Sequence, residues 1–240
     1  ADMHTFFTRG VYGVSVMTAC VAGNSYGIGA SVTLPSAFID KEFSLIAEDY
    51  QIRAAKTGML ADAELIETVV KNYQQYNFGP LVVDPVIVTK HGNLLLEEAA
   101  LSSLKEKLVP LATVLTPNFY EAEKLTGRTL TTDEDYVQAA VDLQAMGAKN
   151  VMIKGFHTKE SNQEEVRDYV LLESGRSFWL SAVFYPTDRI NGTGDTLSAC
   201  IAAELAKGKT VEEAIRTAKD YVNIAIGEEI IVGHKYGPIN

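Results

Sequence analysis

The chain has 240 residues, of which 47% are hydrophobic and 22% are charged, as in ordinary globular proteins. Its formal net charge of −10 argues against a nucleic-acid partner, because binding a phosphate backbone requires a basic surface. The sequence contains no signal-peptide pattern and no apolar run close to the ~20 residues that cross a membrane. We therefore expect one cytoplasmic domain over residues 1–240, with no membrane partner and with Cys20 and Cys200 reduced.

Short apolar runs alternate with amphipathic stretches along the chain. We predict strands at residues 14–21, 52–59, 81–83, 112–115 and 151–153, and helices at residues 37–49 and 64–73. Thr131 and Glu134 have the spacing of a capping box, which predicts a helix that ends before Gly147. Residues 169–172 and 178–180 flank a polar turn and predict a hairpin. Because apolar strands alternate with helices, we expect an α/β fold whose mainly parallel sheet is covered by helices on both faces.

Three of the predicted strands run into polar residues, which are Asp84, Asn118 and Lys154. Taken singly, the first two could form turns beside the prolines next to them, and the lysine could lie on the surface. In a parallel sheet, however, the carboxyl ends of the strands meet at one edge, where ligands bind. The three residues together favour a common site.

The strongest local signal is the segment from Asn191 to Thr196, which reads Asn-Gly-Thr-Gly-Asp-Thr and precedes an apolar helical stripe. A glycine-bearing turn that opens a helix directs free backbone N–H groups at an anion, and Gly192 and Gly194 would let that anion approach. Asp195 is either an electrostatic cap of the helix or the carboxylate that accepts a proton from a substrate hydroxyl during phosphoryl transfer. The spacing fits neither a Walker A motif nor a dinucleotide-binding motif.

A second pair of residues has two interpretations. Glu121 follows Asn118 by three residues, which is the spacing of a helix cap with a carboxylate in the first turn. The same pair suits a Mg²⁺ site, because this ion takes few direct protein ligands and keeps waters and phosphate oxygens. No Cys/His cluster in the sequence has the ligand spacing of a zinc site.

Six segments in combination resemble the ribokinase superfamily, specifically its branch of hydroxymethylpyrimidine (phosphate) kinases and pyridoxal kinases. They are Arg-Gly-Val-Tyr-Gly-Val from Arg9, Lys-Thr-Gly-Met-Leu from Lys56, Val-Asp-Pro-Val from Val83, Leu-Thr-Pro-Asn from Leu115 with Glu-Ala-Glu from Glu121, Ile-Lys-Gly from Ile153 with His157, and Gly-Thr-Gly-Asp-Thr-Leu-Ser-Ala from Gly192. The resemblance covers nearly the whole chain. It implies a ribokinase-like three-layer αβα sandwich that transfers the γ-phosphate of ATP to a primary alcohol on a heteroaromatic ring, with Mg²⁺ as cofactor, and that forms a homodimer.

The resemblance also implies roles for individual residues. The implied anion hole consists of Gly192, Thr193 and Gly194, with Asp195 in the position of the catalytic base. The implied contacts with ATP and its Mg²⁺ come from Lys154, Thr187, Asn118, Asp84 and Glu121. The implied ring pocket includes Met59, Val88 and the position of Gly23.

The sequence departs from the branch at several points. Asp195 stands where the branch usually has cysteine, although the wider superfamily uses aspartate. Gly23 stands where pyrimidine kinases usually have a ring-binding glutamine, which leaves room for pyridoxal as the substrate. Phe156 replaces an expected glycine in the nucleotide-side loop. The amino-terminal strand and the Gly-rich substrate loop of the family are not found in this sequence.

Three functional hypotheses follow. We expect a kinase of hydroxymethylpyrimidine or its monophosphate, which belongs to thiamine biosynthesis. A pyridoxal kinase shares the fold and chemistry and differs mainly in its contacts with the ring. A non-catalytic ligand-binding module is the third hypothesis, and Asp195 argues against it because a binding module has no need of a base.

Overall fold

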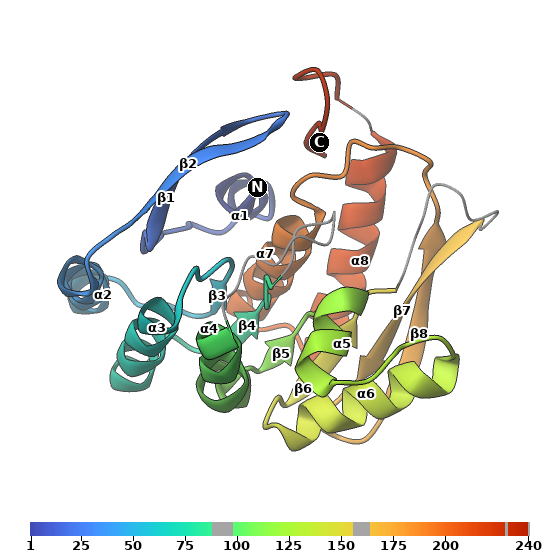
Figure 1. Cartoon of the computed structure of the whole chain (residues 1–240), viewed down its shortest axis with the longest axis horizontal. Coiled ribbons are helices and arrows are strands. Elements are labelled where there is room, and N and C mark those ends of the chain that lie inside the picture. The colour runs from blue at the N-terminus through green and yellow to red at the C-terminus, as the bar shows by residue number, and fades with distance from the viewer. Residues whose placement is uncertain (88–97, 156–163, 229, 240) are drawn as a thin grey trace.

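The centre of the molecule is a six-stranded sheet in the order β3-β4-β5-β6-β7-β8 (Figure 1). The computed structural model describes residues 1–87, 98–155, 164–228 and 230–239. The strands are Ala55–Thr57 (β3), Leu81–Val83 (β4), Val114–Leu115 (β5), Asn150–Ile153 (β6), Glu165–Leu171 (β7) and Ser177–Val183 (β8). Strands β3 to β6 are parallel, whereas β7 and β8 form the predicted antiparallel hairpin. The prediction of a mainly parallel sheet is confirmed.

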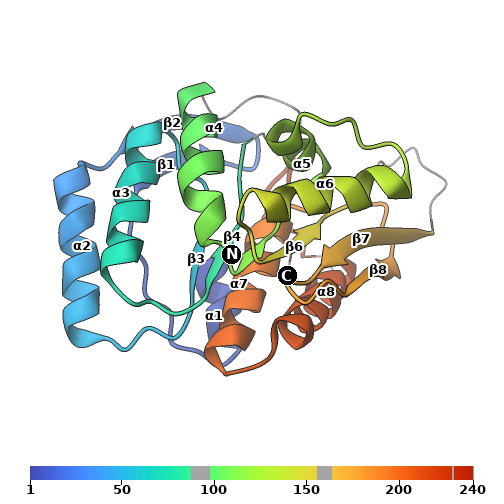
Figure 2. The ribbon, with the colours of Figure 1, turned by 90° about the horizontal axis from the view of Figure 1, so that it is seen from below.

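Helices cover both faces of this sheet, and Figure 2 shows the two helical layers with the sheet between them. One layer contains α1 (Asp2–Thr8), α7 (Thr193–Ala206) and α8 (Val211–Gly227). The other contains α2 (Ser36–Asp49), α3 (Ala63–Gln75), α4 (Glu98–Ser103), α5 (Phe119–Thr126) and α6 (Asp133–Ala145). A π-helical turn at Leu104–Leu108 and a 3-10 turn at Val109–Leu111 follow α4. The expected three-layer αβα sandwich is therefore present.

The continuous apolar strands have a direct structural cause, because each strand buries side chains on both faces. Leu81 and Val83 of β4 belong to the core under α2 to α6, whereas Val82 belongs to the core under α7 and α8. Successive side chains of a strand point to opposite faces, so a strand covered on both faces, such as β4, carries apolar residues at successive positions. No described helix has the length and apolar character that crossing a bilayer requires.

The predicted helices at 37–49 and 64–73 correspond to α2 and α3, but the predicted capping box is wrong by one residue. The cap of α6 is formed by Thr132 and Asp135 instead of Thr131 and Glu134. The Asp135 carboxylate accepts N–H hydrogen bonds from both Thr131 and Thr132, at 3.0 and 2.8 Å. These bonds hold the pKa of Asp135 down at about 2. The sequence has two adjacent threonines followed by consecutive acidic residues, so more than one position of the capping box fits it.

The predicted strand at 14–21 is also wrong in its extent. The strand β1 begins at Ala19 and continues to Asn24, and it pairs with β2 (Gly27–Thr33) in a separate antiparallel ribbon. Figure 1 shows this ribbon apart from the central sheet. β-Branched residues favour an extended backbone, but a β-strand forms only where a neighbouring strand supplies hydrogen bonds. The two glycines of β2 lower its strand propensity, which is why no strand was predicted there.

A buried ion pair joins the sheet to α8 next to the ends of the parallel strands. Lys219 of α8 lies 2.6 Å from Asp168 of β7, and both residues are buried. The other oxygen of Asp168 accepts the N–H of Gly155 at 2.9 Å.

We expect Lys219→Met to lower the free energy of unfolding by about 3–5 kcal/mol, because it leaves the Asp168 carboxylate buried without its cation. Urea denaturation measures this loss. The control is Lys71→Met, which removes an exposed ion pair with Asp40 and should cost less than about 1 kcal/mol. Equal losses in the two variants would contradict the prediction.

Candidate active site

The polar residues that follow the parallel strands come together at one edge of the sheet. Asp84 follows β4, Asn118 follows β5 and Lys154 follows β6. The Nζ atom of Lys154 lies 3.2 Å from Oδ1 of Asp84, and its backbone N–H donates to the carbonyl of Pro117 at 2.9 Å. Asn118 and Lys154 also form an isolated parallel bridge. The topology thus brings three residues of distant sequence segments to one place.

Burial and charge at this edge act in opposite directions on Lys154. Burial alone would lower the pKa of its ammonium group, but the negative charges of Asp84 and Glu121 raise that pKa above its usual value. Lys154 is therefore a permanent cation at neutral pH, with its side chain 19% exposed. A partly buried cation of this kind attracts phosphate oxygens strongly, because little water screens it.

Glu121 is the acidic group whose pKa the site changes most clearly. Its side chain is buried, and burial together with the charge of Asp84 raises the pKa of its carboxyl to about 7, although Lys154 acts in the opposite direction. Its Oε2 accepts the N–H of Asn118 at 2.7 Å, and Asn118 Oδ1 accepts the N–H of Glu121 at 2.9 Å. These two bonds form a complete capping box at the start of α5. The cap interpretation of this pair is therefore correct, and a role in metal binding would come in addition to it.

The acidic groups of this edge fit a hydrated Mg²⁺ ion. One lysine faces two carboxyl groups, and burial, with the charge of Asp84, raises the pKa of Glu121. In the part of the chain that the structure describes, no three His, Cys, Asp or Glu side chains gather as a metal cage. Mg²⁺ needs no such cage, because it binds through one or two carboxylates together with water and phosphate oxygens. Asp84 and Glu121 are the residues that would hold it.

The glycine-bearing loop lies directly over the Asp84–Lys154 pair. Gly192 caps α7 in a left-handed conformation with φ +85°, and it has no side chain that could bond to the first turn of the helix. The N–H of Thr193 donates to the carbonyl of Ile190 at 3.4 Å. The first turn of a helix lacks intrahelical acceptors for its N–H groups, so an end of this kind suits an anion. A methyl group on Gly194 would lie 3.3 Å from Oδ2 of Asp84 and 3.4 Å from Nζ of Lys154. The absence of a side chain at this position lets the helix approach the ion pair closely.

Asp195 lies in the first turn of α7 beside a cation that sequence reasoning did not assign to the site. Its Oδ1 lies 3.5 Å from Nζ of Lys56, and the same ammonium lies 3.0 Å from Oδ1 of Asp2. The Lys56 side chain is 5% exposed, while that of Asp195 is 47% exposed. The signal available in the sequence was a lysine within a predicted strand, at the start of the Lys-Thr-Gly-Met-Leu segment.

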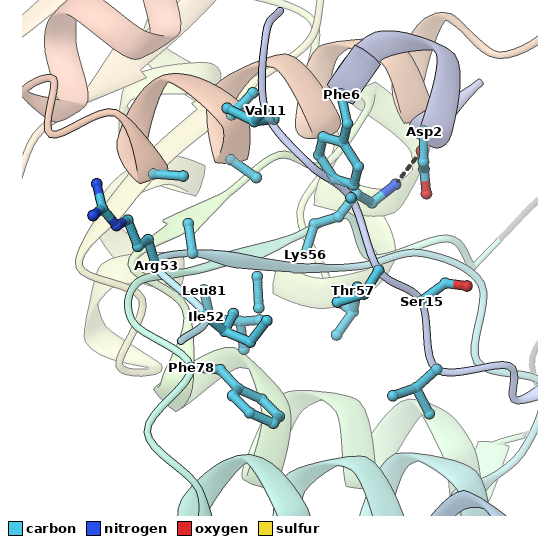
Figure 3. Close-up of a pocket in the computed structure, with 18 of the residues that line it drawn as sticks. Asp2, Phe6, Val11, Ser15, Ile52, Arg53, Lys56, Thr57, Phe78 and Leu81 are labelled. Carbon is cyan, nitrogen blue, oxygen red and sulfur yellow. Dashed lines mark hydrogen bonds and ion pairs between the residues drawn. The ribbon is translucent and has the colours of Figure 1, made fainter. Parts of the chain in front are cut away.

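A cavity of about 600 Å³ borders this group of charges. It lies between residues 10–18 and β3, and its wall includes Met59. Figure 3 shows apolar side chains such as Phe6 and Phe78 around it, with Lys56 reaching toward Asp2 at one end. Thr57 also lines the cavity, and its buried hydroxyl has no hydrogen-bond partner among the described residues. A molecule in this cavity would find both an apolar wall and an unsatisfied polar group.

Two of the remaining predicted site residues, Gly23 and Thr187, lie in described parts of the chain outside this group. Gly23 lies in the exposed ribbon strand β1, where a methyl group would come 2.9 Å from the carbonyl of Gly27. Thr187 lies in the segment between β8 and α7, and its Oγ1 accepts the N–H of Arg189 at 3.1 Å. Val88, like Phe156 and His157, lies outside the described residues. The roles expected for Gly23, Thr187 and Val88 stay predictions.

Comparison with known proteins adds independent information. A family model described as phosphomethylpyrimidine kinase matches residues 1–240. A hydroxymethylpyrimidine/phosphomethylpyrimidine kinase of Haemophilus influenzae is 45% identical over 240 residues, which are 100% of this chain and 89% of that protein. The ADP complex of a Bacillus subtilis pyridoxal kinase has a TM-score of 0.90 at 34% identity, covering 99% of this chain and 89% of the other. A phosphomethylpyrimidine kinase from Clostridium difficile has a TM-score of 0.81 at 34% identity, with coverage of 94% and 91%.

The raised pKa of Glu121 predicts a pH-dependent stability. Without added divalent metal, the folded state keeps a proton on Glu121 up to about pH 7, whereas the ordinary pKa of this group is 4.5. The folded state therefore binds more protons between these values, so the free energy of unfolding falls as the pH rises through them, by roughly 3 kcal/mol.

Glu121→Gln should remove this slope, because glutamine can still close a capping box but has no carboxyl to ionise. Urea denaturation of both proteins at several pH values between about 5 and about 8 measures the effect. An unchanged slope in the variant would show that another group causes it.

Proposed function

The chain belongs to the phosphomethylpyrimidine kinase family of the ribokinase superfamily, and on this premise we propose that it transfers the γ-phosphate of ATP to hydroxymethylpyrimidine or to its monophosphate. The observation that carries the proposal is the convergence of a proton acceptor, an anion-binding helix end and a buried cation. Asp195, the loop Gly192–Gly194 and Lys154 lie within one continuous network of close approaches at the sheet edge.

The phosphate groups of ATP fit the positive side of this network. In our proposal, the N–H groups of Gly192, Thr193 and Gly194 bind the oxygens of the transferring phosphoryl group, and Lys154 holds the neighbouring phosphates. Donors fixed in place before the reaction stabilise the charge that develops during transfer. Mg²⁺, when bound through Asp84 and Glu121, would neutralise phosphate charge, with Asn118 close to the nucleotide. Thr187 would approach the nucleotide from the segment before the loop.

Asp195 would start the transfer with the pyrimidine alcohol. Its carboxylate accepts the proton of the hydroxymethyl group as the oxygen forms a bond to the γ-phosphorus of ATP. The bond between that phosphorus and the β–γ bridging oxygen breaks, and ADP leaves. With the monophosphate as acceptor, a phosphate oxygen takes the place of the alcohol oxygen. The half-exposed position of Asp195 allows an acceptor to reach it.

Pyridoxal is the second candidate substrate. It is favoured by the likeness to the Bacillus subtilis pyridoxal kinase and by Gly23, which has no side-chain amide that could bind a pyrimidine ring. In either case Met59 and Val88 would contact the ring. A homodimer is the assembly that the family resemblance implies, and sedimentation or light scattering of the purified protein tests it.

The first experiment measures ATP consumption with Mg²⁺ and equal concentrations of hydroxymethylpyrimidine, its monophosphate or pyridoxal. We expect Asp195→Asn to lower kcat for an alcohol acceptor by about 10²–10⁴-fold, because it removes the proton acceptor. Asp220→Asn, at an exposed position of α8, is the control and should keep kcat.

Each outcome of this experiment has a defined meaning. Turnover of a pyrimidine supports the main proposal, whereas turnover of pyridoxal alone replaces the substrate and keeps the chemistry. Equal and negligible turnover in the wild type and in Asp195→Asn would favour a non-catalytic module.

A further inference from the structure

Lys56 is the one residue in the described part of the chain whose cation is shared between Asp195 and a second carboxylate. Its Nζ atom lies 3.5 Å from Oδ1 of Asp195 and 3.0 Å from Oδ1 of Asp2. The lysine side chain is 5% exposed, but the two carboxylates are 47% and 39% exposed. The cation is thus fixed inside the protein, and the anions that it binds face the outside.

The sheet determines the direction of this side chain. Lys56 is the central residue of β3, and it lies in register with Val82 of β4. Val82 points into the core below α7 and α8, and residues in register on neighbouring strands point to the same face. Lys56 therefore points toward α7 and α1 and not toward the opposite helical layer. Figure 3 shows it passing from β3 to Asp2 in α1.

The backbone at Gly58 restricts the position of the Lys56 ammonium. A methyl group on Gly58 would lie 3.7 Å from Nζ of Lys56 and 3.8 Å from Oδ1 of Asp195, so the backbone at this glycine lies directly beside the pair. The ion pair uses Oδ1 of Asp195. Among residues 1–87, 98–155, 164–228 and 230–239, no hydrogen bond or ion pair is found for Oδ2. One oxygen of the carboxylate is held, and the other is left to receive a proton.

We propose that Lys56 is a positioning residue for Asp195: its ammonium, anchored by Asp2, fixes Oδ1 and thereby aims Oδ2 at the hydroxyl of the acceptor. This inference rests on the proposed function of Asp195 as the proton acceptor. A carboxylate that is half exposed would otherwise sample several side-chain rotamers and turn toward water. Precise orientation matters for such a group, because a displacement of about 1 Å at a reacting atom can cost 10²-fold in rate.

The test measures kcat and KM for ATP and for both pyrimidine acceptors. We expect Lys56→Met to lower kcat with the alcohol acceptor by about 10²-fold and to leave KM for ATP within about threefold, since Lys154 and the loop still bind the phosphates. Lys56→Arg keeps the cation and should restore much of kcat. Lys207→Met removes another lysine ion pair near the far end of α7, with Glu204, and is the control that should keep kcat.

A double variant separates a positioning role from a structural one. In the Asp195→Asn background, Lys56→Met should cost less than about threefold more, because residues that act through one another are not additive. Losses that multiply would overturn the inference, as would an unchanged kcat in Lys56→Met or a loss confined to the monophosphate acceptor, which would indicate direct contact with its phosphate.

The two proposals fail in different ways. If the wild type phosphorylates an acceptor and Asp195→Asn does not, an active Lys56→Met disproves the positioning role alone. If the wild type consumes ATP with neither pyrimidine, the same variants are compared with pyridoxal as acceptor; if it consumes ATP with none of the three, the proposed function fails and this inference fails with it. Circular dichroism and thermal melting of each variant establish that a loss of kcat does not come from unfolding.

Discussion

The ion pair between Asp84 and Lys154 is the interaction on which the arrangement of the site depends. These residues leave the sheet at the ends of β4 and β6, which are separated by β5, and their contact spans 70 residues of sequence. The first turn of α7 rests on the pair because Gly194 brings no side chain into the gap. Glu121 is buried nearby, and burial and the charge of Asp84 raise the pKa of its carboxyl against the opposing effect of Lys154. The sheet edge therefore holds both a lysine and two carboxyl groups under the first turn of α7, which is the combination that the proposed phosphoryl transfer with Mg²⁺ would use.

The same helix turn has a second lysine on its other side. Lys154 lies near Gly194, and Lys56 lies near Asp195, so two consecutive residues of α7 are each next to a cation that comes from the sheet. Both lysines belong to the edge where the parallel strands end, and the apolar stripe of α7 packs the helix onto that sheet. The charges are thus held by rigid elements, and the positions of the reacting groups depend on core packing instead of on loops.

The residue proposed to distinguish the substrate rings lies in a different part of the fold from the residues proposed for phosphoryl transfer. The sheet edge, the loop and the two lysines lie in elements that pack into the core, whereas Gly23 lies in the exposed β1–β2 ribbon. Its strands are exposed along almost their whole length, so core packing constrains them little. Under the proposed roles, the ring contact at Gly23 can change without disturbing the residues proposed for phosphoryl transfer. This separation would give a physical reason why kinases with pyrimidine and pyridoxal substrates can share one fold.

The sequence by itself determined the elements whose signals are local. Continuous apolar runs predicted the buried strands β4 to β6, helical spacing predicted α2 and α3, and the glycine-bearing segment marked the turn that opens α7. Local spacing is sufficient in these cases because each signal involves neighbours within one or two turns of chain. Only the tertiary structure decided that residues 11–18 stay outside the strands, that β1 pairs with β2, and that Lys56 lies between Asp2 and Asp195. Strand pairs and ion pairs join segments that are far apart in the sequence. The register of the sheet decides which distant residues meet, and no local sequence pattern indicates that register.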